Sequence, residues 1–143
     1  MLKGIDPYLT PDLLCALAEM GHADRLALVD RNFPAYHGDG PVIQLPHTTM
    51  AEVLSAILQV FPVDTFPDSP IIHMLTDDGK DGPALAALSA VWDGIEGRQV
   101  ETLGLIRHGE DGFYARAKTA YVTVQTGETL PYACYLLPKG VIF

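Results

Sequence analysis

A chain of 143 residues in which 48% of the side chains are hydrophobic and 19% are charged has the composition of a globular protein, and its length suits one domain, residues 1–143. Nine basic and eighteen acidic side chains give a formal net charge of −9 at pH 7, which argues against nucleic acids and anionic membrane surfaces as partners. No apolar run is long enough to cross a bilayer and no secretory leader is recognisable, so we expect a cytoplasmic protein with no membrane partner.

The first element predicted along the chain is an amphipathic helix. Thr10 and Pro11 are typical of a helix start, Gly21 is typical of a helix end, and leucines and alanines recur between them at helical spacing. Cys15 lies in this helix, where we expect a buried free thiol. It forms neither a CxxC motif nor a zinc-finger pattern with Cys134, the other cysteine of the chain.

A short and wholly apolar run, residues 26–29, predicts a strand that is buried on both faces. His22 precedes this strand and Asp30 directly follows it. Because ligands of open α/β sheets bind at the carboxyl ends of strands, Asp30 is a site candidate, and the His22 imidazole can exchange a proton near neutral pH. A surface histidine and a turn aspartate are the structural alternative for this pair.

The rest of the chain alternates predicted strands and helices. Thr49 and Glu52 form a capping-box pattern ahead of the clearest helix, which Pro62 ends, and Pro83 begins another helix that we expect to run to about Gly94. The other predicted elements are strands at 42–45, 70–75, 102–107, 121–126 and 134–137 and a short helix at 112–118. This order predicts an α/β fold, a single layered domain with a mostly parallel or mixed central sheet flanked by helices.

Several ionisable residues favour structural roles. We expect His47 to face solvent and His73, inside an apolar strand, to be a hydrogen-bonded core histidine. The acidic side chains of the loop 76–82 are expected to form a solvated turn. Residues 108–111 follow a predicted strand, and they can form either a solvated loop or the rim of a site.

Common phosphate, nucleophile and zinc motifs are absent from the chain: there is no GxGxxG, GxxxxGK[ST], GxSxG or HExxH. A metal site from His22, Asp24, Asp30 and His37 is conceivable, but its spacing matches no familiar ligand pattern. Acid–base chemistry by His22 and Asp30 remains, with the Tyr132 hydroxyl as a further candidate. A tyrosine packed against the sheet edge is the structural alternative for Tyr132.

Residues 11–36 and 113–141 resemble the L-fucose mutarotase and D-ribose pyranase family. The shared motifs are GH-x-D at 21–24, D-x-x-FP at 30–34, TGE-x-x-x-Y at 126–132 and KGV at 139–141. The start of the chain and its middle elements align in the same order, so the resemblance covers nearly the whole chain. The NFPA and FYxRAKxA patterns are closer to the fucose branch than to the ribose branch.

The resemblance implies a homo-oligomer, often a ring of ten, with a monosaccharide site near a subunit interface that the late tyrosine segment of a neighbour completes. It implies interconversion of the anomers or ring forms of an aldose, without a metal or an organic cofactor. By position, His22 corresponds to the family's catalytic histidine, Asp30 to its sugar-binding aspartate and Tyr132 to the tyrosine of its Tyr-Gly-Asn segment. Opening a pyranose needs a proton removed from the anomeric hydroxyl and one delivered to the ring oxygen, which suits an imidazole and a hydroxyl or bound water.

Two positions depart from the family's pattern. Aligned on FYxRA, Glu110 stands where the fucose branch has a sugar-binding arginine, and Cys134 stands where the family has an asparagine. We treat both as substrate-binding candidates that alter the choice of sugar, because a carboxylate accepts hydrogen bonds where a guanidinium donates them. Arg107, three residues before Glu110, is expected to face elsewhere. These departures motivate an alternative function, a non-catalytic sugar-binding or sugar-transport accessory protein.

Overall fold

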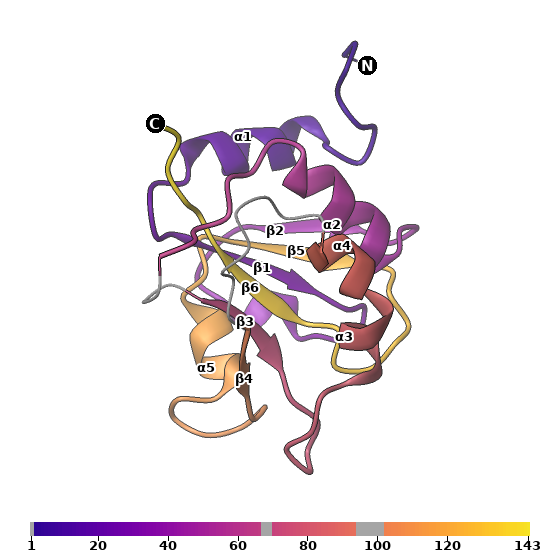
Figure 1. The fold of residues 1–143 in the computed structure, drawn as a ribbon, viewed down its shortest axis with the longest axis vertical. Helices are drawn as coiled ribbons and strands as arrows, with labels where there is room; N and C mark the ends of the chain where they lie inside the picture. Colours follow the sequence, from indigo (N-terminus) through magenta and orange to yellow (C-terminus); the bar gives the residue numbers. More distant parts are fainter. Residues whose placement is uncertain (1, 67–69, 94–101) are drawn as a thin grey trace.

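The computed structural model describes residues 2–66, 70–93 and 102–143, which form a six-stranded mixed sheet flanked by helices (Figure 1). The helices are α1 (Pro11–Glu19), the 3₁₀ turn η1 (Ala35–His37), α2 (Met50–Leu58), α3 (Pro83–Ala87), α4 (Ser89–Asp93) and α5 (Phe113–Lys118). The strands are β1 (Arg25–Val29), β2 (Val42–Leu45), β3 (Ile71–Met74), β4 (Thr102–Leu105), β5 (Val122–Thr126) and β6 (Tyr135–Pro138). Within these ranges no helix combines the length and the apolar character needed to cross a membrane.

The strand order in the sheet is β2-β5-β1-β6-β3-β4. The pairs β1–β5, β2–β5 and β3–β4 are parallel, whereas β6 pairs antiparallel with both β1 and β3. β1 and β3 therefore run in the same direction, and the carboxyl ends of β1, β3 and β4 lie at one edge of the sheet, beside the start of β6. This is the edge at which ligands of open α/β sheets bind.

The sheet separates two apolar layers. Leu26 and Leu28 of β1 belong to the apolar layer that α1, α2, α3 and α4 cover, whereas Ala27 and Val29 belong to the layer on the α5 side. All four side chains are fully buried, which confirms that the apolar run is a strand buried on both faces.

Of the two helices predicted from Thr49 and from Pro83, only the first holds as one helix in the structure. The Thr49 hydroxyl accepts the Glu52 backbone N–H at 3.3 Å, and the Glu52 carboxylate accepts the Thr49 N–H at 2.7 Å, which confirms the capping box. The helix predicted from Pro83 consists instead of two short helices, because the backbone leaves helical geometry at Leu88. Its predicted end at Gly94 lies outside the described residues.

The predicted burial of Cys15 is wrong. Helix α1 buries Leu13, Ala16 and Leu17, and position 15 lies about 200° around the helix from position 13. Cys15 is therefore exposed, with its thiol 3.5 Å from the Glu19 carboxylate, whereas Cys134 is buried.

Candidate functional site

A cavity of about 220 Å³ opens where β1, β3 and β4 end. Its lining combines a carboxyl group, an amide, a guanidinium, two phenols and a thiol with apolar side chains. The lining residues are Asp30, Asn32, Phe33, Met74, Arg107, Tyr114, Pro131, Tyr132 and Cys134. A few directional polar groups set among apolar and aromatic side chains are typical of a small-molecule site.

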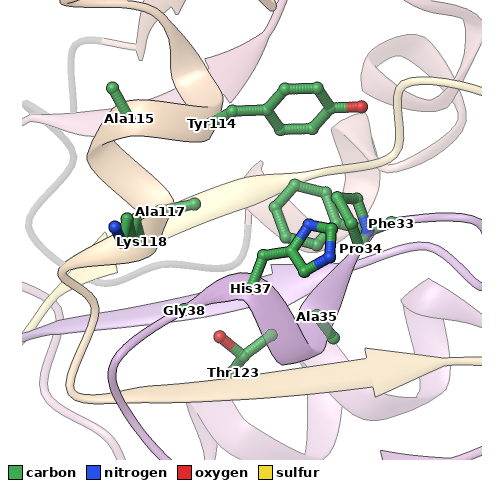
Figure 2. A pocket seen from close by; sticks show the side chains of 10 residues that line it. All are labelled: Phe33, Pro34, Ala35, His37, Gly38, Tyr114, Ala115, Ala117, Lys118 and Thr123. Atoms are coloured by element: carbon green, nitrogen blue, oxygen red, sulfur yellow. The ribbon is translucent and has the colours of Figure 1, made fainter.

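A second cavity of about 320 Å³ lies beside the first and shares Phe33 and Tyr114 with it. Figure 2 shows Tyr114 reaching from α5, with its ring centre 5.3 Å from that of Phe33, and His37 of η1 among the lining residues. The titratable side chains of its lining are His37, Tyr114 and Lys118, and the rest is small or apolar apart from Thr123. It is larger than the first cavity, but it contains none of the residues predicted to bind or act on a sugar.

Asp30 is held rigidly in the first cavity. The carboxyl group is 6% exposed, accepts the Asn32 backbone N–H at 2.9 Å through Oδ1, and accepts the Cys134 thiol at 3.5 Å through Oδ2. Burial raises the pKa of Asp30, and the hydrogen bonds from Asn32 and Cys134 offset only part of that effect. Burial and the neighbouring Asp30 carboxyl also raise the pKa of the Cys134 thiol, so Cys134 remains a protonated donor.

Arg107 and Tyr132 meet on Asp77 at the rim of the cavity. The Arg107 Nη2 lies 3.1 Å from Asp77 Oδ1, and the Tyr132 hydroxyl donates to Asp77 Oδ2 at 3.2 Å. The guanidinium also lies 5.8 Å from the centre of the Tyr132 ring, within range of a cation–π contact. Asp77 is exposed, as expected of its loop, but it orders these two side chains.

Arg107 lines the cavity, and Glu110 does not. The expectation that Arg107 faces elsewhere is wrong: β4 ends at Leu105, so the alternation of side chains along a strand does not govern position 107. Glu110 is exposed and is not part of the cavity lining.

His22 lies in a tight turn between α1 and β1. The Asp24 carboxylate accepts the Gly21 N–H at 2.7 Å, and Ala23 adopts a left-handed φ of 68°. The imidazole Nε2 is 3.1 Å from the buried Asp64 Oδ2, and the Phe66 ring packs edge-on at 5.6 Å. In the described residues the other non-glycine residue with positive φ is Tyr132, at 61°. Such backbones cost about 1–3 kcal/mol each and concentrate at functional sites.

The structure brings Asp30, Tyr132 and Cys134 together in one cavity but leaves His22 out of it. His22 precedes β1 and Asp30 follows it, and a strand of five residues spans roughly 15 Å. The resemblance implies that a neighbour's tyrosine segment completes the site, yet Tyr132 shares a cavity with Asp30 of its own chain. Within one chain, the cavity at Asp30 therefore lacks the imidazole of His22.

The four conceivable metal ligands are not brought together. Asp24 closes its own turn, Asp30 faces the first cavity and His37 lines the second. In the described part of the chain no group of three or more histidine, cysteine or acidic side chains is arranged to hold a metal ion.

The predicted burial of His73 and the predicted exposure of His47 are confirmed. His73 is 4% exposed in β3, 3.6 Å from Asp81, and burial lowers its pKa. His47 is exposed.

Two sequence motifs act as supports for the candidate residues. In TGE, Thr126 Oγ1 donates to the Val29 carbonyl at 3.0 Å and Glu128 accepts the Met50 N–H at 3.1 Å, which ties the carboxyl end of β1 to α2. In KGV, Lys139 Nζ donates to the Leu17 and Met20 carbonyls at the end of α1, next to the His22 turn.

Arg107 and Asp64 are the residues that sequence reasoning missed. Arg107 was misplaced because the predicted strand extends to residue 107, whereas β4 ends at Leu105. Asp64 lies 42 residues from His22 and carries no local motif, so only the structure reveals their contact.

The chain is similar to known proteins over nearly its whole length. The sequence model of the RbsD / FucU transport protein family matches residues 3–142. An L-fucose mutarotase of Histophilus somni is 38% identical over 141 residues, covering 99% of this chain and 97% of that protein. A fucose mutarotase of Danio rerio is 39% identical over 155 residues, covering 99% of this chain and 95% of that protein.

A solved structure has the same fold. The crystal structure of the fucose mutarotase in complex with L-fucose from Streptococcus pneumoniae matches with a TM-score of 0.88 and 35% identity, covering 99% of this chain and all of that chain. The similarity therefore extends over the sheet, both helical layers and the edge at which Asp30 lies.

Proposed function

This chain belongs to the RbsD / FucU family, and we propose on that premise that it is a cofactor-independent mutarotase acting on a fucose-like aldose. The observation that carries the proposal is the cavity at Asp30. The buried carboxyl group shares this cavity with the guanidinium of Arg107, the phenol of Tyr132, the thiol of Cys134 and several apolar side chains. Such a lining offers hydrogen-bond donors and acceptors to sugar hydroxyls and apolar contact to the sugar ring.

The chemistry needs two proton transfers and no redox step. His22 takes the proton of the anomeric hydroxyl, the bond between the anomeric carbon and the ring oxygen breaks, and the ring oxygen receives a proton from the Tyr132 hydroxyl or a bound water. The open-chain aldehyde then closes on its other face by the reverse transfers. Asp30 and Tyr132 hold and polarise the sugar, and general acid–base help of this kind contributes about 10²- to 10⁴-fold.

We further propose that the complete site forms between two copies of the chain. The Asp30 cavity of one copy receives the His22 turn of the next, because His22 lies at the other end of β1 in its own chain. A contact between the two different ends of a subunit is heterologous, and heterologous contacts close into rings when the rotation allows it. A homo-oligomeric ring accounts for an imidazole and a carboxyl that lie far apart in each chain.

Exposed apolar side chains at the His22 end favour such a contact. Phe66, which packs on His22, is 47% exposed, and Ile142 and Phe143 are 84% and 106% exposed. At the other end, Ile106, next to Arg107, is 55% exposed. Large apolar side chains grouped in this way are typical of surfaces that a partner covers.

The expected setting follows from this activity. The expected partner molecule is a monosaccharide. The net charge of −9 opposes binding to nucleic acid and to anionic membranes, and we expect neither as a partner. We expect the protein in the cytoplasm.

A non-catalytic sugar-binding or transport-accessory protein is the second candidate. Cys134 favours it, because a thiol that donates to Asp30 replaces an amide able to bind sugar hydroxyls in both directions. Such a protein binds a sugar saturably and leaves the exchange of its anomers at the rate of the buffer.

Saturation-transfer NMR of anomer exchange over L-fucose, D-ribose, L-rhamnose and D-galactose tests the proposal. We expect acceleration with one or two of these sugars, and its loss in His22→Ala. If His22→Ala exchanges every accepted sugar as fast as the unmodified protein, the assignment of His22 fails. Saturable binding without acceleration establishes the second candidate instead.

A further inference from the structure

Among the described residues, Asp64 is the carboxylate that contacts the imidazole of His22, and the proposed function does not use it. Asp64 Oδ2 lies 3.1 Å from His22 Nε2, and the Asp64 side chain is 3% exposed while that of His22 is 44% exposed. An ionised carboxylate only accepts hydrogen bonds, so Nε2 carries the hydrogen of this contact.

Hydrogen bonds hold both the backbone and the carboxylate of Asp64 in place. Its N–H donates to the Pro138 carbonyl at 2.9 Å, and Oδ1 accepts the Phe66 N–H at 3.0 Å. The segment after β6 packs closely on the same loop: the Gly140 N–H donates to the Pro62 carbonyl at 2.7 Å, and a Cβ at Gly140 would lie 2.8 Å from the Val63 carbonyl oxygen. Asp64 therefore has little freedom to follow His22 if the histidine moves.

The His22 turn is attached to the same segment. The Ala23 N–H donates to the Lys139 carbonyl at 2.9 Å, and the Lys139 N–H donates to the Asp24 carbonyl at 2.8 Å. The loops that carry His22 and Asp64 are thus both hydrogen-bonded to residues 138–140. The KGV motif therefore helps to place the two side chains next to each other.

From this geometry we propose that Asp64 is a positioning residue for the proposed mutarotase reaction: it holds His22 with hydrogen on Nε2 and leaves Nδ1 to exchange the proton with the sugar. The inference rests on the proposed function for its catalytic consequence, but the tautomer itself does not depend on it. When Nδ1 takes the anomeric proton, the O–H bond breaks and an N–H bond forms. The resulting imidazolium then faces a buried carboxylate that favours its charge.

Asp64→Asn is the matched test, because the amide oxygen can still accept the Phe66 N–H while the negative charge is removed. ¹⁵N NMR of the labelled histidine ring, in the absence of sugar, reports the tautomer of His22. We expect hydrogen on Nε2 in the unmodified protein and a mixed tautomer in Asp64→Asn. Asp12→Asn, which removes an exposed carboxylate of α1, should leave the tautomer unchanged.

The kinetic consequence is separate. Asp64→Asn should lower kcat by about 10- to 100-fold with little change in KM, since only a share of the general acid–base contribution depends on orientation. Asp64→Glu should recover part of it. Hydrogen on Nδ1 in the unmodified protein overturns the inference even where every variant fails to fold, and so does an unchanged tautomer in a folded Asp64→Asn. If the tautomer shifts as expected but His22→Ala remains fully active, the proposed function fails and the contact with Asp64 stands.

Discussion

His22 and Asp30 lie at the two ends of β1, so the pair that the sequence marks out as an acid–base couple does not meet within one chain. The two ends of β1 carry different functional groups. The Asp30 end has a cavity with a guanidinium and a phenol, whereas the His22 end has an imidazole backed by a buried carboxylate. The two halves are complementary, which is what a site shared between neighbouring subunits requires.

Arg107 should contribute to sugar affinity, and Glu110 should not. Arg107→Ala removes charge-assisted donors from the cavity rim, and we expect KM to rise by about 10- to 100-fold, the value of one such hydrogen bond. Glu110→Gln, at an exposed position outside the cavity, is the matched control and should leave KM unchanged. A raised KM in Glu110→Gln with an unchanged KM in Arg107→Ala would contradict this prediction and assign sugar binding to Glu110.

Cys134 should govern which sugar is preferred. Cys134→Asn restores an amide with both donors and an acceptor next to Asp30, and we expect the ratio of kcat/KM between two accepted aldoses to change by about tenfold or more. Cys134→Ser keeps a small donor to Asp30 and should preserve the order of preference. Identical selectivity in all three proteins would show that position 134 only packs.

The two thiols should differ sharply in reactivity. Cys15 is exposed, whereas burial raises the pKa of Cys134 and excludes the reagent. Alkylation of the native protein, followed by mass spectrometry, should modify Cys15 and spare Cys134 until denaturant is added. Because the Glu19 carboxylate accepts from the Cys15 thiol and raises its pKa, Glu19→Gln should speed that reaction. Rapid native modification of Cys134 would contradict the burial described here.

Asp30 should lower stability at neutral pH. Burial raises the pKa of Asp30 in the folded protein above its unfolded value, so the folded state holds the proton more tightly. Stability is then lost as pH rises from the unfolded pKa through the folded pKa, and the full penalty is present above both. Asp30→Asn should therefore increase the free energy of unfolding at pH 7, with the gain shrinking below the ordinary aspartate range. Urea unfolding at one protein concentration checks this, and a gain independent of pH would refute it.

Elements with local signals could be predicted from the sequence. The β1 strand follows from an unbroken apolar run, and α2 follows from the Thr49–Glu52 capping box, since both depend on residues within one turn or strand. The position of Asp30 at the carboxyl edge follows from β1 alone. Cys15 shows the limit of this approach: presence in an amphipathic helix does not decide which face a residue occupies.

Long-range contacts could not be predicted in this way. Asp64 meets His22 only because the segment after β6 fastens two distant loops together. Arg107 enters the cavity because β4 ends two residues earlier, and no rule of strand alternation extends into the loop that follows. The separation of His22 from Asp30 depends on the direction in which β1 crosses the sheet, not on their closeness in sequence.

Mixing two inactive variants tests the central claim most directly. His22→Ala keeps an intact Asp30 cavity, and Asp30→Asn keeps an intact His22 turn. If each site takes one group from each of two neighbouring copies, random co-assembly should make about a quarter of the sites intact and restore a matching share of anomer exchange. If both groups of a site come from one chain, every site in the mixture carries a defect and exchange stays at the level of the separate variants.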